Sequence, residues 1–151
     1  MKARTETLNV VTERRHGYVD ITDELRRAIK DTGVTEGCAV AFCTHTTAAL
    51  LINEWEDGAL DDFRSRLDEL VPGNVAYAHD DMQRRTQNLD EAHERPNGRS
   101  HVGQMLLGQT SHAIPVSGGE PMLGRWQRLI LLELDEPKPK GRDVIFHVFG
   151  E

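Results

Sequence analysis

Two short apolar runs joined by a polar segment constrain the fold of this chain more than any other feature of its sequence. Residues 38–43 (CAVAFC) and 49–52 (ALLI) contain no charged side chain, and residues 44–47 (THTT) separate them. Uninterrupted apolar runs of this length, bounded by Gly37 and by hydroxyl residues, are typical of strands covered on both faces. We therefore predict two central strands, connected by the polar segment that contains His45.

The rest of the chain predicts three helices and several more strands. Apolar residues recur at spacings of three and four between Asp57 and Leu70, which predicts a helix over 57–70. Further helices are expected from the capping residue Thr22 to Gly33 and over 97–107, and strands over 5–12, 18–20, 112–116, 122–134 and 143–149. The pattern predicts an α+β fold on an antiparallel or mixed sheet, and 151 residues without a linker predict a single domain over 1–151.

Composition excludes several classes of function. The chain has 25 acidic and 18 basic residues and a net charge of −7, which disfavours nucleic acid as a partner. No run of about 18 apolar residues is present, and the N-terminus lacks the apolar stretch of a signal peptide, so we expect neither a membrane span nor classical secretion. Cys38 and Cys43, the only cysteines, fit reduced core thiols of a cytoplasmic protein.

Three histidines are candidate metal ligands. His45 lies between the two predicted central strands, His79 precedes Asp80, whose carboxylate could orient the ring, and His101 lies on the predicted helix at 97–107. Together they could hold a divalent ion, preferably zinc, with a fourth position open for water or substrate. No close pair such as His-Glu-x-x-His occurs, so ordinary surface histidines remain the alternative. His93 is a reserve ligand.

Other polar residues have a structural and a functional interpretation. Asn53, Glu54 and Glu56 either cap the following helix and match its dipole, or they hold the residues of the site in place, with Glu54 as a general acid–base group. Gln127, at the start of the longest predicted strand, either faces a ligand cavity or shapes its rim. Residues 74–96 are polar and nearly without aliphatic periodicity, which predicts a functional loop or a mobile lid.

Sequence blocks spread over nearly the whole chain occur in one order: CTHTTAA at 43–49, INE at 52–54, YAHD at 77–80, residues 97–101 followed by LLG at 106–108, IPV at 114–116 and LGRWQ at 123–127. This order resembles the YjbQ family, whose members are also described as secondary thiamine-phosphate synthase enzymes. The chain departs from the family pattern in two places. Arg125 stands where the family usually has threonine, and the turn after Glu133 has an altered sequence that contains proline and lysine.

The resemblance implies a compact α+β domain with a sandwich-like or barrel-like body, commonly assembled as a homotrimer. It also implies a metal-associated cleft. The metal ligands carried over to this chain are His45, His79 and His101, and the residues expected near them are Asn53, Glu54, Asn97 and Gln127.

The implied reaction joins hydroxymethylpyrimidine pyrophosphate to a thiazole phosphate and releases pyrophosphate. A divalent ion, assisted by a basic residue such as Arg125 or Arg142, would neutralise the leaving group. Magnesium is the usual partner of pyrophosphate, whereas a histidine-rich site suits zinc, so we expect a weak or secondary synthase activity. The alternatives are a zinc-dependent hydrolase of a small phosphorylated metabolite, with Glu54 as base, and a non-catalytic ligand-binding module.

Overall fold

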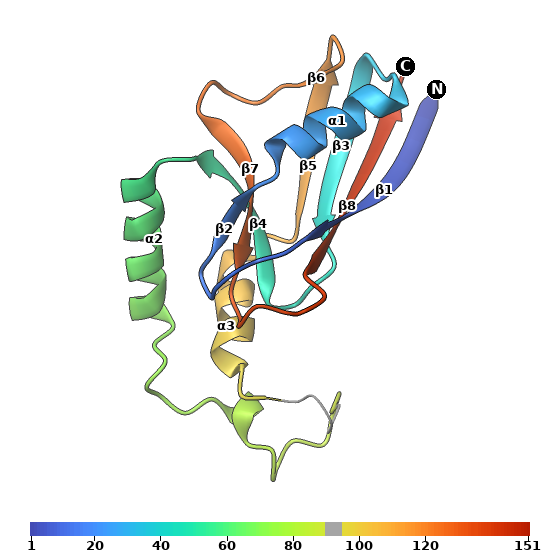
Figure 1. Cartoon of the computed structure of the whole chain (residues 1–151). Coiled ribbons are helices and arrows are strands. Elements are labelled where there is room, and N and C mark those ends of the chain that lie inside the picture. Colours follow the sequence, from blue (N-terminus) through green and yellow to red (C-terminus); the bar gives the residue numbers. More distant parts are fainter. Residues whose placement is uncertain (90–94) are drawn as a thin grey trace.

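The computed structural model describes residues 1–89 and 95–151, and its fold consists of two antiparallel sheets and three α-helices (Figure 1). The strand orders are β1–β8–β3–β5–β6 and β2–β7–β4. The predicted α+β class with three helices is therefore confirmed. None of the helices in the described ranges is long and apolar enough to cross a membrane. The elements are β1 (Lys2–Val10), β2 (Tyr18–Asp20), α1 (Thr22–Thr32), β3 (Glu36–Cys43), β4 (Ala48–Glu54), α2 (Asp57–Leu70), the 3-10 helix η1 (Ala78–Asp80), α3 (Gly98–Leu107), β5 (Ser111–Ser117), β6 (Glu120–Pro121), β7 (Gln127–Glu133) and β8 (Arg142–Gly150).

The main core lies between the two sheets and α1. The buried face of α1 contributes Leu25, Ala28 and Ile29, which recur at helical spacing. Inward-facing residues of both sheets complete this apolar cluster, among them Phe146 of β8 and Leu131 of β7. Burial of these apolar side chains is the main favourable term in folding and fixes how the sheets pack together.

A second apolar cluster covers the other face of the three-stranded sheet. Ala49 of β4 and Leu132 of β7 pack there with Leu67 at the end of α2. The prediction that the run at 49–52 is covered on both sides is therefore confirmed for the first part of β4. For β3 the prediction is wrong, because only its inward face is fully buried and Phe42 on the outward face is 41% exposed. The prediction of a central strand is wrong for β4, which lies at the edge of its sheet beside β7.

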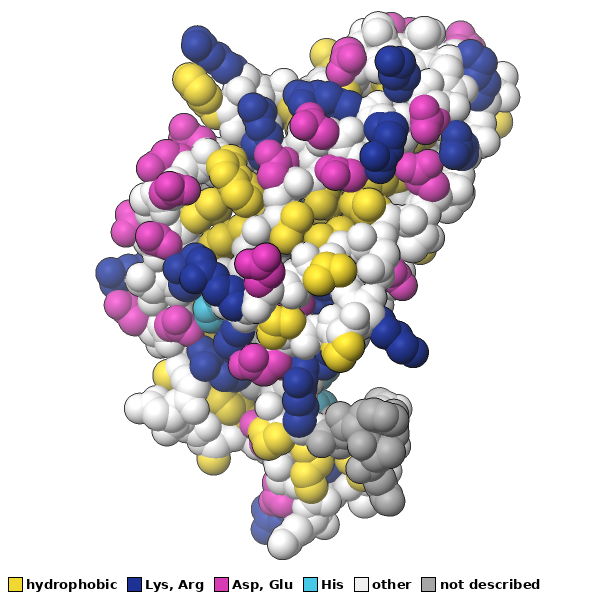
Figure 2. All heavy atoms as spheres, viewed as in Figure 1, with side chains coloured by type: hydrophobic (Ala, Val, Ile, Leu, Met, Phe, Trp, Pro, Cys, Tyr) yellow, Lys and Arg dark blue, Asp and Glu magenta, His cyan; other side chains and the backbone are white. Residues whose placement is uncertain are grey.

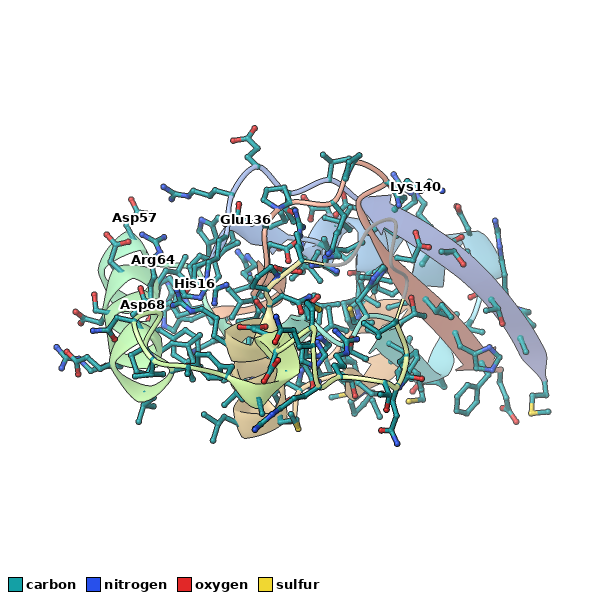
Figure 3. The ribbon with its side chains drawn as sticks, turned by 90° about the horizontal axis from the view of Figure 1, so that it is seen from below. His16, Asp57, Arg64, Asp68, Glu136 and Lys140 are labelled. Atoms are coloured by element: carbon teal, nitrogen blue, oxygen red, sulfur yellow. The ribbon has the colours of Figure 1, made fainter. Side chains whose placement is uncertain are left out.

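Helix α2 is attached to the three-stranded sheet through β2 and the loop before it. The hydroxyl of Tyr18 donates a hydrogen bond to the carbonyl oxygen of Leu60 at 3.0 Å. His16 is buried and points toward the side of α2 that carries Arg64 and Asp68, and its Nδ1 lies 3.6 Å from Oδ1 of Asp68 (Figure 3). The hydrogen bond of Tyr18 and the packing of the buried His16 ring hold α2 beside the sheet.

Two local predictions need correction. The strand predicted over 122–134 is shorter, because Gln127 donates its N–H to the carbonyl of Gly124 and accepts the N–H of Gly124 on its side chain, closing a turn before β7. Thr22 is the first residue of α1 rather than its cap. Its hydroxyl donates to Asp20 at 2.5 Å and accepts the N–H of Leu129, so it connects the helix to the sheet.

Candidate functional site

His79 and His101 form a contacting pair at the end of the molecule where η1 approaches α3 (Figure 1). Their ring centroids are 4.4 Å apart, with 53° between the ring planes. The carboxylate of Asp80 accepts the backbone N–H groups of Asn97 and Gly98 at 2.8 and 2.7 Å, which fastens η1 to the start of α3. This connection brings together two histidines that are distant in sequence.

Glycine is required at the junction between η1 and α3. A Cβ atom added to Gly98 would lie 2.6 Å from Cβ of Tyr77, closer than two carbon atoms can pack, and 3.2 Å from Cβ of His79, which is a tight contact. In the described part of the chain, Nε2 of His79 is buried and has no hydrogen-bond partner. A buried imidazole nitrogen without a partner is costly unless a ligand, a metal ion or water completes it.

The histidine pair opens onto a cavity of about 970 Å³. Two guanidinium groups and one carboxylate line it: Arg84 lies 3.6 Å from Asp81, and Arg85 donates to backbone carbonyls of the same loop. Guanidinium groups match phosphate oxygens in geometry and charge, so the cavity suits a phosphorylated ligand. The lining residues are Thr46, Ala78, His79, Asp81, Arg84, Arg85, Thr86, Gln87, Asn88 and His101.

His45 is adjacent to the cavity in sequence, but its ring takes part in a different set of contacts. Its Nε2 accepts the backbone N–H of Asp143 at 2.9 Å, and its Nδ1 lies 3.4 Å from Nη1 of Arg142. Burial and the neighbouring guanidinium lower the pKa of His45, because a second positive charge is unfavourable there. The described contacts therefore hold His45 as a neutral ring between a backbone donor and a cation.

Arg142 contacts the carboxylate of Glu133 through two guanidinium nitrogens, and both side chains are almost completely buried. One contact, from Nε to Oε2, measures 2.8 Å. The hydroxyl of Thr12 and the N–H of Asp135 donate to the same carboxylate at 2.8 and 3.0 Å. Glu133 thus has the hydrogen bonds that a buried charge needs. Its partner Arg142 is the residue that contacts Nδ1 of His45.

Asn97 belongs to a neighbouring polar group that connects α3 to the segment between β7 and β8. Its Nδ2 donates to Asp135 at 3.2 Å, and Ser100 and Lys138 also contact that carboxylate, at 3.4 and 2.9 Å. Burial opposes ionisation of Asp135, but hydrogen bonds from Lys138 and Asn97 outweigh it and lower the pKa. In the contacts described, Asn97 therefore supports the start of the helix that carries His101.

The remaining predicted site residues lie at the opposite end of the three-stranded sheet. Asn53 and Glu54 end β4, whose other end adjoins the segment of His45, and a rise of about 3.3 Å per residue separates the two ends by about 20 Å. Glu54 lies opposite Gln127 in the pairing of β4 with β7, and the side chain of Gln127 accepts the N–H of Gly124. Cζ of Arg125 lies 4.6 Å from the ring centroid of Trp126. Within one chain, therefore, Asn53, Glu54, Arg125 and Gln127 do not lie beside the histidine pair.

Asn53 and Glu54 instead line a separate cavity of about 330 Å³ between β4, α2 and α3. Its walls are mostly apolar, with Phe63, Leu106 and Ile130 among them. Capping of the following helix is confirmed for Glu56, whose carboxylate accepts the N–H groups of Gly58 and Ala59, and these hydrogen bonds lower the pKa of Glu56. Asn53 and Glu54 precede this cap and do not serve as caps themselves.

The predicted three-histidine metal site is matched only in part. His79 and His101 are close enough to share a ligand, and Nε2 of His79 is the kind of nitrogen that binds a metal. His45 does not fit in this arrangement, because a backbone N–H occupies one ring nitrogen and a guanidinium faces the other. Over residues 1–89 and 95–151, no group of three or more histidine, cysteine or acidic residues is placed to hold an ion. The reserve ligand His93 lies outside the described residues.

Sequence reasoning missed the arginines of the cavity and the buried carboxylate behind His45. The dipeptide Arg84-Arg85 lies close to His79 in a polar segment, and this charge cluster could have indicated the arginines of the cavity. Glu133 interrupts an apolar strand, and a carboxylate in such a run indicates a buried partner.

The fold and the cavity define an α+β protein of two antiparallel sheets with a cavity lined by histidine and arginine. The family model described as "UPF0047 protein YjbQ-like" matches residues 6–151. The chain therefore belongs to the YjbQ-like UPF0047 family, as the order of its sequence blocks predicted.

Relatives from archaea and bacteria match nearly the whole chain. The UPF0047 protein of Archaeoglobus fulgidus is 35% identical over 133 residues, which is 88% of this chain and 93% of the relative. UPF0047 protein YugU of Bacillus subtilis is 33% identical over 136 residues, 89% and 92% of the two chains. The crystal structure of a YbjQ-like protein of unknown function from Sulfolobus solfataricus P2 has a TM-score of 0.83, with 29% identity over 99% of both chains. A hypothetical protein from Aeropyrum pernix K1 has a TM-score of 0.80, with 32% identity over 98% of this chain and 99% of its own.

Proposed function

We propose that the protein is an enzyme for a small phosphorylated substrate and has weak or secondary thiamine-phosphate synthase activity. The observation that carries this proposal is the cavity in which Arg84 and Arg85 line the same space as His79 and His101. At about 970 Å³ it is large enough for two small reactants side by side. The choice of reaction comes from the resemblance to the YjbQ family.

The chemistry of the synthase reaction suits this set of residues. The thiazole nitrogen attacks the methylene carbon with its lone pair, the C–N bond forms, and the C–O bond to pyrophosphate breaks. The nitrogen becomes quaternary, so no proton has to be removed from it and no general base is required. What the protein must supply is positive charge for the departing pyrophosphate and alignment of the reactants, and Arg84 and Arg85 are placed to provide the charge.

The hydrolase alternative needs a general base, and the residue predicted for that role was Glu54. In one chain Glu54 lies at the far end of β4 from the segment of His45 and lines a different cavity. The geometry of the single chain therefore supports the synthase over a hydrolase that uses Glu54.

A divalent metal ion also belongs to the proposal, with His79 and His101 as the residues that would hold it. Imidazole nitrogens favour zinc over magnesium, and such an ion would add positive charge beside the arginines. The homotrimer and the cytoplasmic location are proposals as well. Exposed Met105 and Leu106 on α3 support association, since each is more than half exposed, and the two unpaired cysteines agree with a reducing compartment. Light scattering of the purified protein measures the oligomeric state.

We expect purified protein to release pyrophosphate only when both hydroxymethylpyrimidine pyrophosphate and thiazole phosphate are present. The variant carrying Arg84→Gln and Arg85→Gln should lower the rate at least about tenfold, because it removes two charge-assisted contacts to the leaving group. The matched control is Arg27→Gln, an exposed arginine of α1 outside this cavity. Release of pyrophosphate from the pyrimidine substrate alone would favour a hydrolase, and saturable binding without turnover would favour a ligand-binding module.

For the metal, we expect elemental analysis to find a bound divalent ion in the wild type and only traces in His79→Ala and His101→Ala. His45→Ala should retain the ion, since both nitrogens of His45 face donors in the structure. His147→Ala is a matched control, because that ring contacts the hydroxyl of Thr5 on the five-stranded sheet. Loss of the ion from His45→Ala would contradict the two-histidine arrangement and return His45 to the ligand set.

A further inference from the structure

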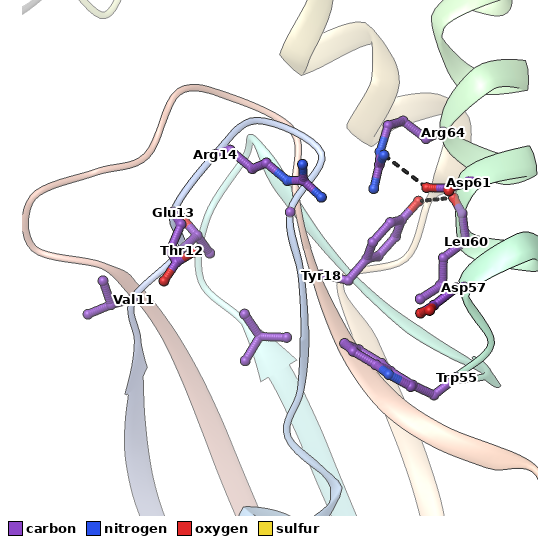
Figure 4. Close-up of a pocket in the computed structure, with 12 residues that line it drawn as sticks. Val11, Thr12, Glu13, Arg14, Tyr18, Trp55, Asp57, Leu60, Asp61 and Arg64 are labelled. Atoms are coloured by element: carbon purple, nitrogen blue, oxygen red, sulfur yellow. Dashed lines mark hydrogen bonds and ion pairs between the residues drawn. The ribbon is translucent and has the colours of Figure 1, made fainter.

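A third cavity, which shares no lining residue with the histidine cavity, lies between the loop before β2 and helix α2 (Figure 4). Its volume is about 660 Å³. On the face of the molecule drawn in Figure 2, apolar side chains are exposed between α2 and α1, with acidic and basic side chains around them. The lining residues are Val11, Thr12, Glu13, Arg14, Gly17, Tyr18, Val19, Trp55, Asp57, Leu60, Asp61 and Arg64.

Two aromatic rings form one wall of this cavity. Trp55 is 41% exposed, which is high for the largest apolar side chain, and its indole faces the cavity beside Tyr18 (Figure 4). The hydroxyl of Tyr18 donates to the carbonyl of Leu60, so the orientation of the phenol ring is fixed. Cζ of Arg64 lies 5.8 Å from the centroid of the Tyr18 ring, within the range of a cation–π contact. One ring of the wall thus already has a cationic neighbour, while Trp55 remains available to a second cation.

The charges around the cavity favour a cation over an anion. Arg64 pairs with Asp61 at 3.0 Å, so these two charges compensate each other. Of the residues that line the cavity, all of them in the described part of the chain, Glu13 and Asp57 form no ion pair, and Arg14 is the one lining guanidinium without such a pair. Two unpaired carboxylates against one unpaired cation leave the cavity with an excess of negative charge.

The beginning of α2 does not reverse this preference. A helix N-terminus attracts anions through its exposed N–H groups and its dipole. Here the carboxylate of Glu56 already accepts the N–H groups of Gly58 and Ala59, at 2.9 and 2.7 Å. The helix end is therefore satisfied by the chain itself, and Asp57 adds a further negative charge beside it.

We propose that this cavity is a binding site for a small organic cation, such as an alkylammonium group, seated against the indole of Trp55. Asp57 and Glu13 provide the counter-charge, and Val11 and Val19 contact the apolar part of the ligand. Tryptophan is the best aromatic partner for a desolvated cation, and alkylated ammonium ions are the usual ligands of such sites. The site is independent of the proposed synthase activity.

The test is titration of the purified full-length protein with choline chloride, at constant ionic strength, while the indole N–H signals are followed by NMR. Trp126→Phe assigns the two signals, since Trp55 and Trp126 are the only tryptophans. We expect a saturable shift of the Trp55 signal. The dissociation constant should rise about fivefold or more in Trp55→Leu, followed through backbone amide signals, and in Asp57→Asn, because each loses one attraction to the cation.

The neutral isostere 3,3-dimethylbutan-1-ol, which has the shape of choline without its charge, should bind at least about fivefold more weakly. Asp62→Asn is the matched control for Asp57→Asn, because Asp62 is an exposed carboxylate of α2 that does not line the cavity. No saturable shift at Trp55, an equal response to the neutral isostere, or equal weakening in Asp62→Asn would each overturn the proposal. Unchanged thermal unfolding in the variants separates lost binding from lost folding.

Discussion

Arg142→Met is expected to lower the free energy of unfolding by about 3–5 kcal/mol, because it leaves the carboxylate of Glu133 buried without its cation. Both side chains are at most 2% exposed, so water cannot replace the guanidinium. The hydroxyl of Thr12 and the N–H of Asp135 still donate to the carboxylate, but they do not supply a positive charge. Urea unfolding followed by circular dichroism measures the loss.

The double variant Arg142→Met with Glu133→Leu should recover much of this loss, since removal of both charges leaves no unpaired ion in the core. The exposed pair Arg66 and Glu69 supplies the control, and Arg66→Met should change the stability by less than about 1 kcal/mol. If Arg142→Met does not fold, Thr12→Val removes one donor to the same carboxylate and should cost about 1 kcal/mol. Additive losses in the double variant would contradict the role given to the buried pair.

The same pair indicates which parts of the fold can be predicted from the sequence. Helix α2 was predicted with the bounds that it has, because its apolar residues recur at helical spacing whatever they pack against. Arg142 and Glu133 carry no such signal, since charged residues are normally exposed and only a specific partner makes their burial tolerable. Their pairing depends on how β7 and β8, which belong to different sheets, come together in three dimensions.

In the candidate site, too, some features could be predicted from the sequence and others depend on how distant segments pack together. The resemblance selected His79 and His101, which lie together, but chain spacing could not predict that Asp80 would fasten η1 to the start of α3. Proximity in sequence was misleading for Glu54, because an extended strand carries successive residues away from its beginning by about 3.3 Å each. Burial on both faces of β3 was wrong for a related reason. The apolar run predicts a strand, but which faces are covered depends on where α2 and α3 pack, and both lie on the other sheet.

Lowering the pH from 7 to 4 is expected to reduce the stability of the protein through His16. Burial of the ring, aided by the charge of Arg15 and opposed by Asp68, lowers the pKa of His16 from about 6.5 to about 4. Between these two values the unfolded chain binds a proton that the folded protein does not bind, so the free energy of unfolding falls as the pH falls. The neutral ring contributes its full stabilisation above about pH 6.5, and about 3 kcal/mol of it is lost by pH 4.

His16→Asn isolates this contribution. His16 has a φ of 54°, a left-handed conformation that asparagine tolerates better than most residues. The backbone N–H of residue 16, which donates to the carbonyl of Glu133 at 2.7 Å, is retained in the variant. Urea unfolding of both proteins between pH 8 and pH 4 gives two stability curves, and their difference cancels acid effects at other sites. The wild type should lose about 3 kcal/mol more than His16→Asn over this range. Parallel curves would mean that His16 accepts a proton in the folded protein as readily as in the unfolded chain, and that burial does not hold the ring neutral.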